Sequence, residues 1–246
     1  MVSLVVIAKN EADRIGECLQ SVPIATEKIV LDCGSLDETV SIARSSGARV
    51  VQTDWPGFVI QKNRALEEAS GSWVLSLDAD ERLSKEAVMN LMRAIENPGA
   101  ASGMSFPRCS NWLGREIRHG RWYPDRQVRV VKRGRGRWVG GAVHESLQVD
   151  GPVLALSGDI EHVPYRSFRE HLSTIRRYSA LDASSMADDG VRARWWHLAG
   201  GPPLHFVNAY LFKMGFRDGG AGLALAGLGA AHVAMKWMRL WLHQHR

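Results

Sequence analysis

The chain has 246 residues, of which 45% are hydrophobic and 23% are charged. This composition is typical of a globular protein and excludes a disordered or fibrous one. The three cysteines, Cys18, Cys33 and Cys109, are too widely spaced for a disulfide framework or a zinc-ligand pattern, so we expect a reducing compartment. Because no basic stretch leads into an apolar segment at the start, we expect no secretory signal.

The net charge of +5 is unevenly distributed. Residues 1–110 carry 11 Lys and Arg against 15 Asp and Glu, whereas residues 111–246 carry 20 against 11. The acidic part suits a metal ion, and the basic part suits phosphates, nucleic acid or an anionic membrane. No apolar run reaches the roughly 18 residues that a membrane-spanning helix needs.

Strands and helices alternate along the first part of the chain. Short apolar, β-branched runs predict strands, and segments with apolar residues on one face predict helices. The expected strands are 2–8, 28–32, 49–53 and 73–77, and the expected helices are 11–22, 39–46, 58–70 and 85–95. Ser84 is the expected N-cap of the last of these helices. The alternation predicts an α/β fold, a mainly parallel sheet with helices on both faces.

In such sheets, ligands bind beyond the carboxyl ends of the strands. Polar residues follow the expected strands there: Lys9-Asn10-Glu11, Asp32 and Asp78-Ala79-Asp80. Neither a Gly-x-Gly-x-x-Gly motif nor a P-loop occurs, so glycine-rich loops do not hold the phosphates. Two carboxylates at positions i and i+2 suit Mg²⁺ or Mn²⁺, with the diphosphate of a substrate completing the coordination shell.

These residues also carry a family resemblance. The ordered motifs are Lys9-Asn10-Glu11, Leu31 to Thr39, Gln61-Lys62-Asn63, Asp78 to Glu81, Tyr123 to Arg129 and Gly140 to Glu145. Together they resemble the inverting family 2 glycosyltransferases of GT-A fold, and more narrowly the bacterial lipopolysaccharide-core β-glucosyltransferases. The resemblance covers nearly the whole chain. It departs from the usual pattern at Cys33, Leu36 and Glu38, where Ser, Thr and Gly are common.

The resemblance implies a GT-A domain over residues 1–160 and a helical appendage over residues 161–246. It implies that a UDP-sugar donor is bound by six residues: Lys9, Asn10, Glu11, Asp32, Lys62 and Asp78. It also implies that Mn²⁺ or Mg²⁺ is held by Asp80, Asp78 and His144. Glu81 makes three neighbouring carboxylates, and a divalent ion would relieve their mutual repulsion.

Simpler interpretations of several of these residues stay open. Asp32 suits a helix N-terminus, Lys62 suits a solvated helix face, and His144 suits a structural position.

An inverting transfer needs a base that deprotonates the acceptor hydroxyl during the attack. Asp125, which precedes an apolar-alternating run, is the first candidate, and Glu145 is the second. The surrounding basic segment is interleaved with aromatic residues, which stack on sugars while arginines bind phosphates. The residues expected to bind the acceptor are Arg115, Arg118, Arg121, Trp122 and Arg129. Nucleic-acid binding would use the same residue types, but the acidic donor site favours a phosphorylated or lipid-linked saccharide.

The tail is expected to be helical from about Ser167. Residues 192–246 contain seven Lys and Arg and the single acid Asp218, together with many aromatic side chains. This pattern is typical of helices that lie on an anionic membrane, which predicts a peripheral position on the inner, cytoplasmic face of the plasma membrane. The alternative is that the tail packs against the catalytic domain or against a dimer partner.

The function expected from these observations is metal-dependent, inverting transfer of a hexose, most simply glucose. The donor is a UDP-sugar, the acceptor is a lipid-linked saccharide such as lipopolysaccharide core, and the product linkage is β. Two alternatives are a sugar-phosphate nucleotidyltransferase, which usually has a glycine-rich loop after the first strand, and a non-catalytic membrane-binding or nucleic-acid-binding protein.

Overall fold

A computed structural model describes residues 1–141 and 145–245 of the chain. The chain forms two compact units, and each is made of two segments. The first unit comprises Met1–Arg108 and Arg126–His162, and the second comprises Cys109–Asp125 and Val163–Arg246.

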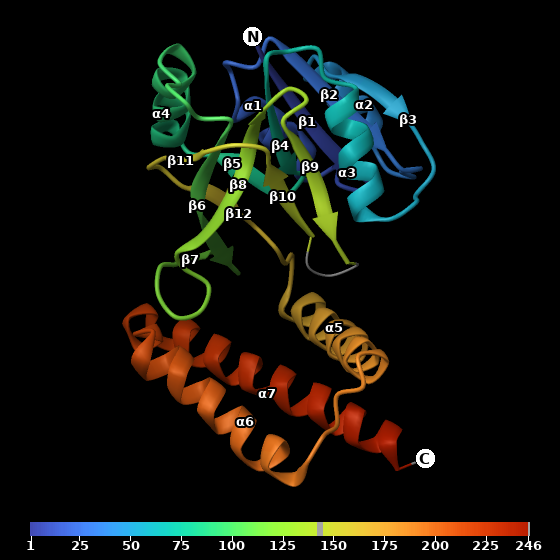
Figure 1. Cartoon of the computed structure of the whole chain (residues 1–246), viewed down its shortest axis with the longest axis vertical. Helices are drawn as coiled ribbons and strands as arrows, with labels where there is room; N and C mark the ends of the chain where they lie inside the picture. The colour runs from blue at the N-terminus through green and yellow to red at the C-terminus, as the bar shows by residue number, and fades with distance from the viewer. Residues whose placement is uncertain (142–144, 246) are drawn as a thin grey trace. The chain divides into compact units, whose positions relative to one another are not determined.

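The first unit contains most of the strands and four helices (Figure 1). Its strands are β1 (Val2–Ala8), β2 (Glu27–Asp32), β3 (Arg49–Gln52), β4 (Trp73–Asp78), β5 (Glu81–Leu83), β6 (Gly103–Trp112), β8 (Asp125–Lys132), β9 (Gly136–Gly140), β10 (Glu145–Val149), β11 (Val153–Ala155) and β12 (Ile160–His162). Its helices are α1 (Ile15–Gln20), α2 (Thr39–Ser45), α3 (Phe58–Glu67) and α4 (Lys85–Glu96). The end of β6 and the first residue of β8 belong to the second unit.

The main sheet has the strand order β3-β2-β1-β4-β8-β6-β12-β5. Strand β1 runs parallel to both β2 and β4, and β2 runs parallel to β3. Strand β8 runs antiparallel to β4, and β5 runs antiparallel to β12. The expected parallel sheet is therefore present at β3-β2-β1-β4, where the carboxyl ends of four strands lie at one edge. Strands β2 and β3 lie on one side of β1, and β4 lies on its other side, so the strand order reverses at β1. Open α/β sheets bind ligands at such a switch point.

The sheet buries both of its faces. Leu4 and Val6 of β1 belong to a core cluster that also contains residues of α1 and α4. Val5, which lies between them, belongs to a second cluster with Ala65 of α3 and Trp138 of β9. Because successive side chains of a strand point to opposite faces, a strand buried on both sides is apolar without interruption. The sequence Val-Ser-Leu-Val-Val-Ile-Ala of β1 has this character at every position except Ser3, which is also buried.

The helix boundaries follow local capping. Ser84 is the N-cap of α4, as expected, and its side chain accepts a hydrogen bond from the Ala87 N–H at 3.2 Å. Helix α1 is shorter than expected because Glu11 begins a turn, in which its carbonyl accepts from the Arg14 and Ile15 N–H groups. The expected helix over 58–70 likewise ends earlier, at Glu67.

The second unit is mainly helical, which confirms the expected C-terminal helical appendage. It contains β7 (Arg115–Ile117), α5 (Phe168–Asp188), α6 (Trp195–Val207), a π-helical turn η1 (Asn208–Phe212), a 3₁₀ turn η2 (Gly215–Asp218) and α7 (Gly219–Gln244). Helix α7 packs against both α5 and α6 (Figure 1). Among the residues that the structure describes, no helix has the length and apolar character needed to cross a membrane.

A buried histidine of α5, His171, contacts aromatic residues from two other segments of this helical unit. His171 of α5 is buried, and its Nδ1 accepts a hydrogen bond from Trp112 Nε1 at 3.0 Å. Its ring stacks on Tyr165 with the centroids 4.1 Å apart. Burial lowers the pKa of His171 to about 4, so the imidazole is neutral at pH 7 and its Nδ1 is free to accept. The segment that joins β6 to β8 is thereby attached to the C-terminal helices.

Candidate active site

The loops after β1 and β2 are held together by polar side chains. Asp32 is fully buried, and it accepts from the Gly34 and Ser35 N–H groups, each at 3.1 Å, and from Ser35 Oγ at 2.5 Å. Asn10 adopts a positive φ of 58°. Its N–H donates to Ser35 Oγ at 2.9 Å, and its Oδ1 accepts from the Leu36 N–H at 2.8 Å. Asp32 and Asn10 therefore shape this part of the sheet edge, while Lys9 beside them is exposed.

A second set of contacts links the same two loops. The Glu11 N–H donates to Thr39 Oγ1 at 2.8 Å, and the Ala12 N–H donates to Asp37 Oδ2 at 3.2 Å. Hydrogen bonds from Thr39, most of all from its hydroxyl, lower the pKa of Asp37. Asp37 is thus a structural carboxylate that ties the two loops together.

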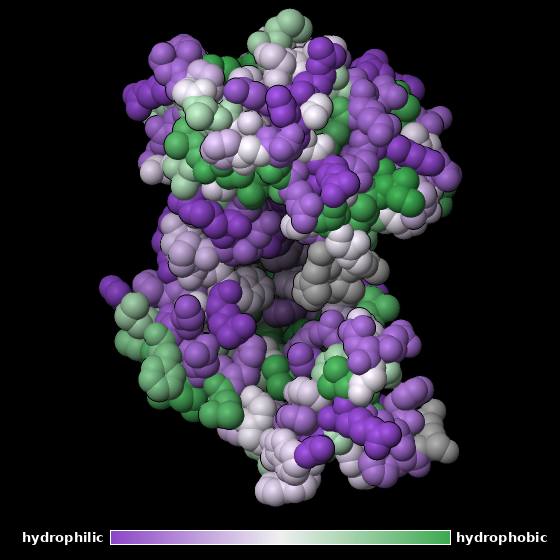
Figure 2. Space-filling view, viewed as in Figure 1, coloured by the Kyte–Doolittle hydropathy of each residue, from purple (hydrophilic) through white to green (hydrophobic). Residues whose placement is uncertain are grey.

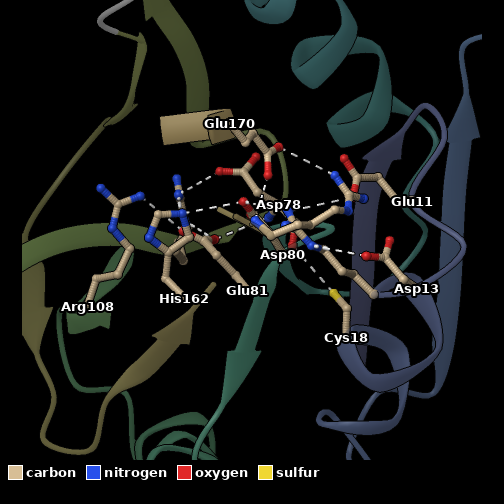
Figure 3. A network of polar contacts seen from close by, with 12 residues as sticks. Glu11, Asp13, Cys18, Asp78, Asp80, Glu81, Arg108, His162 and Glu170 are labelled. Carbon is tan, nitrogen blue, oxygen red and sulfur yellow. Dashed lines mark hydrogen bonds and ion pairs between the residues drawn. The ribbon is translucent and has the colours of Figure 1, made fainter. Parts of the chain in front are cut away.

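Three carboxylates lie together at the end of β4 and the start of β5, and we call Asp78, Asp80 and Glu81 the carboxylate cluster (Figure 3). Glu81 is fully buried. Arg129 donates to its two oxygens from Nε at 2.9 Å and from Nη2 at 2.6 Å, and Arg108 Nη1 lies 3.3 Å from Oε1. Two arginines therefore compensate the charge of Glu81.

Asp78 is held between two buried cations. Lys62 Nζ lies 2.7 Å from Asp78 Oδ1, and Arg129 Nη2 lies 2.9 Å from Oδ2. Burial raises the pKa of Asp78, but Lys62 and Arg129 outweigh it and hold that pKa well below its usual range. Lys62 also lies 3.1 Å from Glu145 Oε1 and 4.4 Å from the centre of the Trp138 ring. Asp78 is therefore anionic at physiological pH.

Asp80 has weaker partners. Its Oδ2 lies 3.4 Å from His162 Nε2 and 3.7 Å from Arg14 Nη1, whereas the cations at Asp78 lie below 3 Å. Arg14 is buried, and its Nη2 has no hydrogen-bond partner among the residues that the structure describes. Asp80 is thus the member of the cluster whose carboxylate is most available to a ligand, with an unused N–H donor beside it.

The cluster differs from the sequence expectation in how its charges are balanced. We expected a metal ion to relieve the repulsion among the three carboxylates, whereas Lys62, Arg108 and Arg129 already compensate two of them. His144, expected to be a metal ligand, lies outside the described residues. Within residues 1–141 and 145–245, no group of three His, Cys, Asp or Glu side chains is arranged to hold a metal ion.

The motif Gln61-Lys62-Asn63 connects α3 to the cluster. Asn63 accepts from the Trp138 N–H at 2.8 Å and donates to the Trp138 carbonyl at 2.9 Å, which attaches β9 to the helix. Gln61 Nε2 donates to Cys33 Sγ at 3.2 Å, in the loop after β2. Lys62 between them is buried and ion-paired, and this excludes the simpler interpretation of a solvated lysine.

The residues expected to bind the acceptor do not share one environment. Arg115, Arg118 and Arg121 are exposed and belong to the second unit, as does the half-buried Trp122. Arg129 belongs to the first unit, is only 3% exposed and uses its guanidinium group on Asp78 and Glu81. This placement favours charge compensation by Arg129 over contact with an acceptor.

The two candidate bases also differ. Glu145 begins β10 and contacts Lys62 in the first unit. Asp125 is the first residue of β8, the strand that carries Arg129, and it belongs to the second unit.

Sequence reasoning missed His162, Arg14 and Arg108. His162 ends β12, and Arg108 lies within β6, so neither belongs to a motif at the end of a parallel strand. Only the pairing of β12 with β5, in which His162 lies opposite Glu81, indicates that His162 is near the cluster.

Comparison with known proteins identifies the family. The model of glycosyl transferase family 2 matches residues 3–144, more than half of the chain, and the chain therefore belongs to this family. The lipopolysaccharide core biosynthesis glycosyltransferase LpsC of Rhizobium meliloti (strain 1021) is 28% identical over 97% of this chain and 91% of its own length. An uncharacterized glycosyltransferase of Rickettsia bellii is 50% identical, but over 35% of this chain and 29% of that protein. The chain is a glycosyltransferase, as the sequence resemblance implies.

A solved structure with the same fold is mannosyl-3-phosphoglycerate synthase from Rubrobacter xylanophilus. It has a TM-score of 0.50 and 19% identity, over 77% of this chain and 75% of that chain. With the family match, this likeness confirms the expected GT-A fold.

The compensation of Glu81 predicts a large effect of removing its main partner. Arg129→Gln leaves a buried carboxylate without its bidentate arginine, and we expect it to lower the free energy of unfolding by about 3–5 kcal/mol. Urea unfolding followed by circular dichroism measures this change. The matched control is Arg135→Gln, which breaks an exposed pair with Asp150 and is expected to cost less than about 1 kcal/mol.

Adding Glu81→Gln to Arg129→Gln removes the uncompensated charge, so it is expected to restore part of the lost stability. Equal costs for Arg129→Gln and Arg135→Gln would contradict the assignment of Arg129 as the counter-ion of the cluster.

Proposed function

We propose that this glycosyltransferase moves a hexose from a UDP-sugar to a lipid-linked saccharide such as lipopolysaccharide core, and that the hexose is glucose. Direct displacement at the anomeric carbon of an α-linked donor inverts the configuration and leaves a β-linkage. The observation that supports this most is Asp80, a weakly paired carboxylate beside two cation-held acids at the carboxyl edge of the parallel sheet. The relation to LpsC, a lipopolysaccharide core glycosyltransferase by name, supports the acceptor class.

We propose that Asp80 and His162 hold a divalent ion, Mn²⁺ or Mg²⁺. Their facing atoms lie 3.4 Å apart on β12 and on the turn before β5, and a carboxylate with an imidazole leaves other coordination positions for diphosphate oxygens. Such an ion, when bound, neutralises the charge that develops on the departing UDP. Arg14 is proposed to donate to a phosphate oxygen, because its buried Nη2 has no hydrogen-bond partner among the described residues and its Nη1 lies 3.7 Å from Asp80 Oδ2.

The other proposed donor contacts come from residues at the carboxyl edge of the parallel strands. Lys9, Asn10 and Glu11 lie at the end of β1 and are proposed to border the nucleotide. Asp32, being fully buried with both oxygens hydrogen-bonded, is proposed to act by holding the loop that carries Ser35. Asp78, whose charge is fixed by two cations, is proposed to accept hydrogen bonds from the ribose or sugar hydroxyls.

Asp125 is the proposed base, and Glu145 is the proposed support of Lys62. Glu145 already uses one oxygen on the Lys62 ammonium group at 3.1 Å, which gives it a role in holding that cation. Asp125 is the position at which the family resemblance implies the base, and it is the first residue of β8, the strand that carries Arg129. Arg115, Arg118, Arg121 and Trp122 are proposed to orient the acceptor.

These roles predict different kinetic effects of two conservative variants. Asp125→Asn removes the base but no charge partner of Lys62, so we expect kcat to fall by on the order of 10²- to 10⁴-fold with donor affinity unchanged. Glu145→Gln weakens the hold on Lys62, so we expect mainly a higher KM for the donor. The measurement is UDP release from UDP-glucose with lipopolysaccharide core as acceptor.

The control for this assay is Asp54→Asn, which removes an exposed carboxylate paired with Arg64 and is expected to leave turnover unchanged. The proposed base is wrong if Asp125→Asn turns over at the wild-type rate. Release of pyrophosphate from UTP and a sugar phosphate, without transfer, would instead indicate a nucleotidyltransferase.

We propose further that α6 and η1 rest on an anionic membrane surface on the cytoplasmic side of the inner membrane. No residue of α6 is buried, and Leu204 and Phe212 are 70% and 76% exposed. Hydrophobic side chains gather on this part of the second unit (Figure 2). Exposed apolar side chains of this size are typical of surfaces that insert into a lipid interface, and the basic residues Arg192, Arg194, Lys213 and Arg217 flank this segment on either side.

Membrane binding by this surface has a direct test in vesicle flotation. Wild-type protein is expected to float with vesicles that contain phosphatidylglycerol, and Leu204→Glu with Phe212→Glu is expected to reduce the bound fraction at least fivefold. A matched control is Met89→Glu, an exposed apolar residue on α4 of the first unit, which should not change binding. Equal flotation of all three proteins would contradict the proposal.

A further inference from the structure

The second unit encloses a cavity of its own. Its volume is about 430 Å³, and all of the residues that line it belong to that unit. The walls come from α5, α7, η2, the end of α6 and the segment after β7. This volume lies in the range of small-molecule sites, which hold ligands of about the size of a sugar phosphate.

The lining of the cavity contains several basic residues. Arg121, His205, His232 and Lys236 all line it, and no Asp or Glu is among the described residues that do. Asp182 holds His232, with Oδ2 2.9 Å from Nε2, and Arg121 donates to Asn208 Oδ1 at 3.3 Å. The side chain of Lys236 makes no hydrogen bond or ion pair with the residues that the structure describes.

His205 interacts electrostatically with the other three residues of this group. Burial lowers the pKa of His205, and Arg121, His232 and Lys236 lower it further, because each of these neighbours carries or can carry a positive charge. The ring of His205 packs directly over Gly229 of α7, where a Cβ atom would overlap Nε2. Of these groups, His232 is paired with Asp182, whereas no carboxylate among the described residues that line the cavity faces His205 or Lys236, and an anion bound there would be attracted by the positive charge.

The lining of the cavity also contains aromatic and apolar residues. Trp122, Tyr165 and Tyr178 line it together with Leu225 and Ala226. Aromatic faces bind sugar rings or hydrocarbon chains through their apolar surface. The composition of the lining therefore suits a ligand that combines an anionic group with a ring or a hydrocarbon chain.

We propose that the helical unit contains a binding pocket for a phosphomonoester, with the phosphate among Arg121, His205, His232 and Lys236. A phosphate has three terminal oxygens and close to two negative charges at neutral pH, and so it can use more of these donors than a carboxylate. The sugar or lipid that carries the phosphate would contact the aromatic residues of the lining, Trp122, Tyr165 and Tyr178. The residues that line the pocket belong to the second unit, whereas the carboxylate cluster belongs to the first. This inference does not depend on the proposed transfer reaction.

Isothermal titration calorimetry on the full chain tests the proposal without any UDP-sugar. The probes are glucose 6-phosphate and dihexanoyl phosphatidic acid below its micelle concentration, which carry the same phosphate on a sugar and on a lipid. Glucose and dihexanoyl phosphatidylcholine, which lack a phosphomonoester, are the controls. We expect at least one phosphomonoester to bind and neither control to bind, and the tighter of the two identifies the source of the ligand.

Variants decide whether the pocket is the binding site. Lys236→Gln is expected to weaken binding at least tenfold, whereas Lys213→Gln, an exposed lysine of the same unit that does not line the cavity, should change it less than twofold. His205→Gln gives an independent test should Lys236→Gln not fold. The proposal is overturned if no phosphomonoester binds the wild type, or if pocket variants and Lys213→Gln have the same effect.

Discussion

The arrangement of the candidate site depends on two cations that are buried beside three carboxylates. Lys62 and Arg129 are 3% exposed each, and between them they contact Asp78, Glu81 and Glu145. A buried carboxylate is tolerated only when an opposite charge and hydrogen bonds replace the water it has lost. Without these cations, the end of β4 could not carry acidic residues at such high density.

This compensation also divides the acidic residues by role. Glu81 is fully buried and bound by two arginines, so its place is structural. Asp78 keeps its negative charge but has both oxygens occupied by cations. Asp80, whose ion-pair partners among the described residues lie 3.4 and 3.7 Å away, is the one on which we base the proposed metal and diphosphate site. Three neighbouring acids in the sequence thus have three different environments.

The sequence was sufficient to predict the features that depend on local pattern. The four parallel strands, the helices between them and the Ser84 cap follow from apolar periodicity and capping residues that lie within a few positions of each other. The carboxyl ends of these strands then identify Asp32, Asp78 and Asp80 as neighbours of one sheet edge, because parallel strands share that edge.

The features that the sequence did not predict depend on pairing between distant segments. The antiparallel pairing of β4 with β8 brings Arg129 to Asp78, and the pairing of β5 with β12 brings His162 to Asp80. A register between strands that are about 50 to 80 residues apart leaves no periodic trace in the sequence. For the same reason, the sequence does not distinguish Arg129 from the other arginines of the basic segment, although Arg129 is buried in the first unit.

Binding of Mn²⁺, followed by electron paramagnetic resonance in the presence of UDP, tests the central claim most directly, because it separates the carboxylates by role. The account predicts that Asp80→Asn abolishes Mn²⁺ binding, while Asp78→Asn leaves most of it, since Asp78 is already bound by Lys62 and Arg129. Loss of binding in Asp78→Asn with retention in Asp80→Asn would contradict the account.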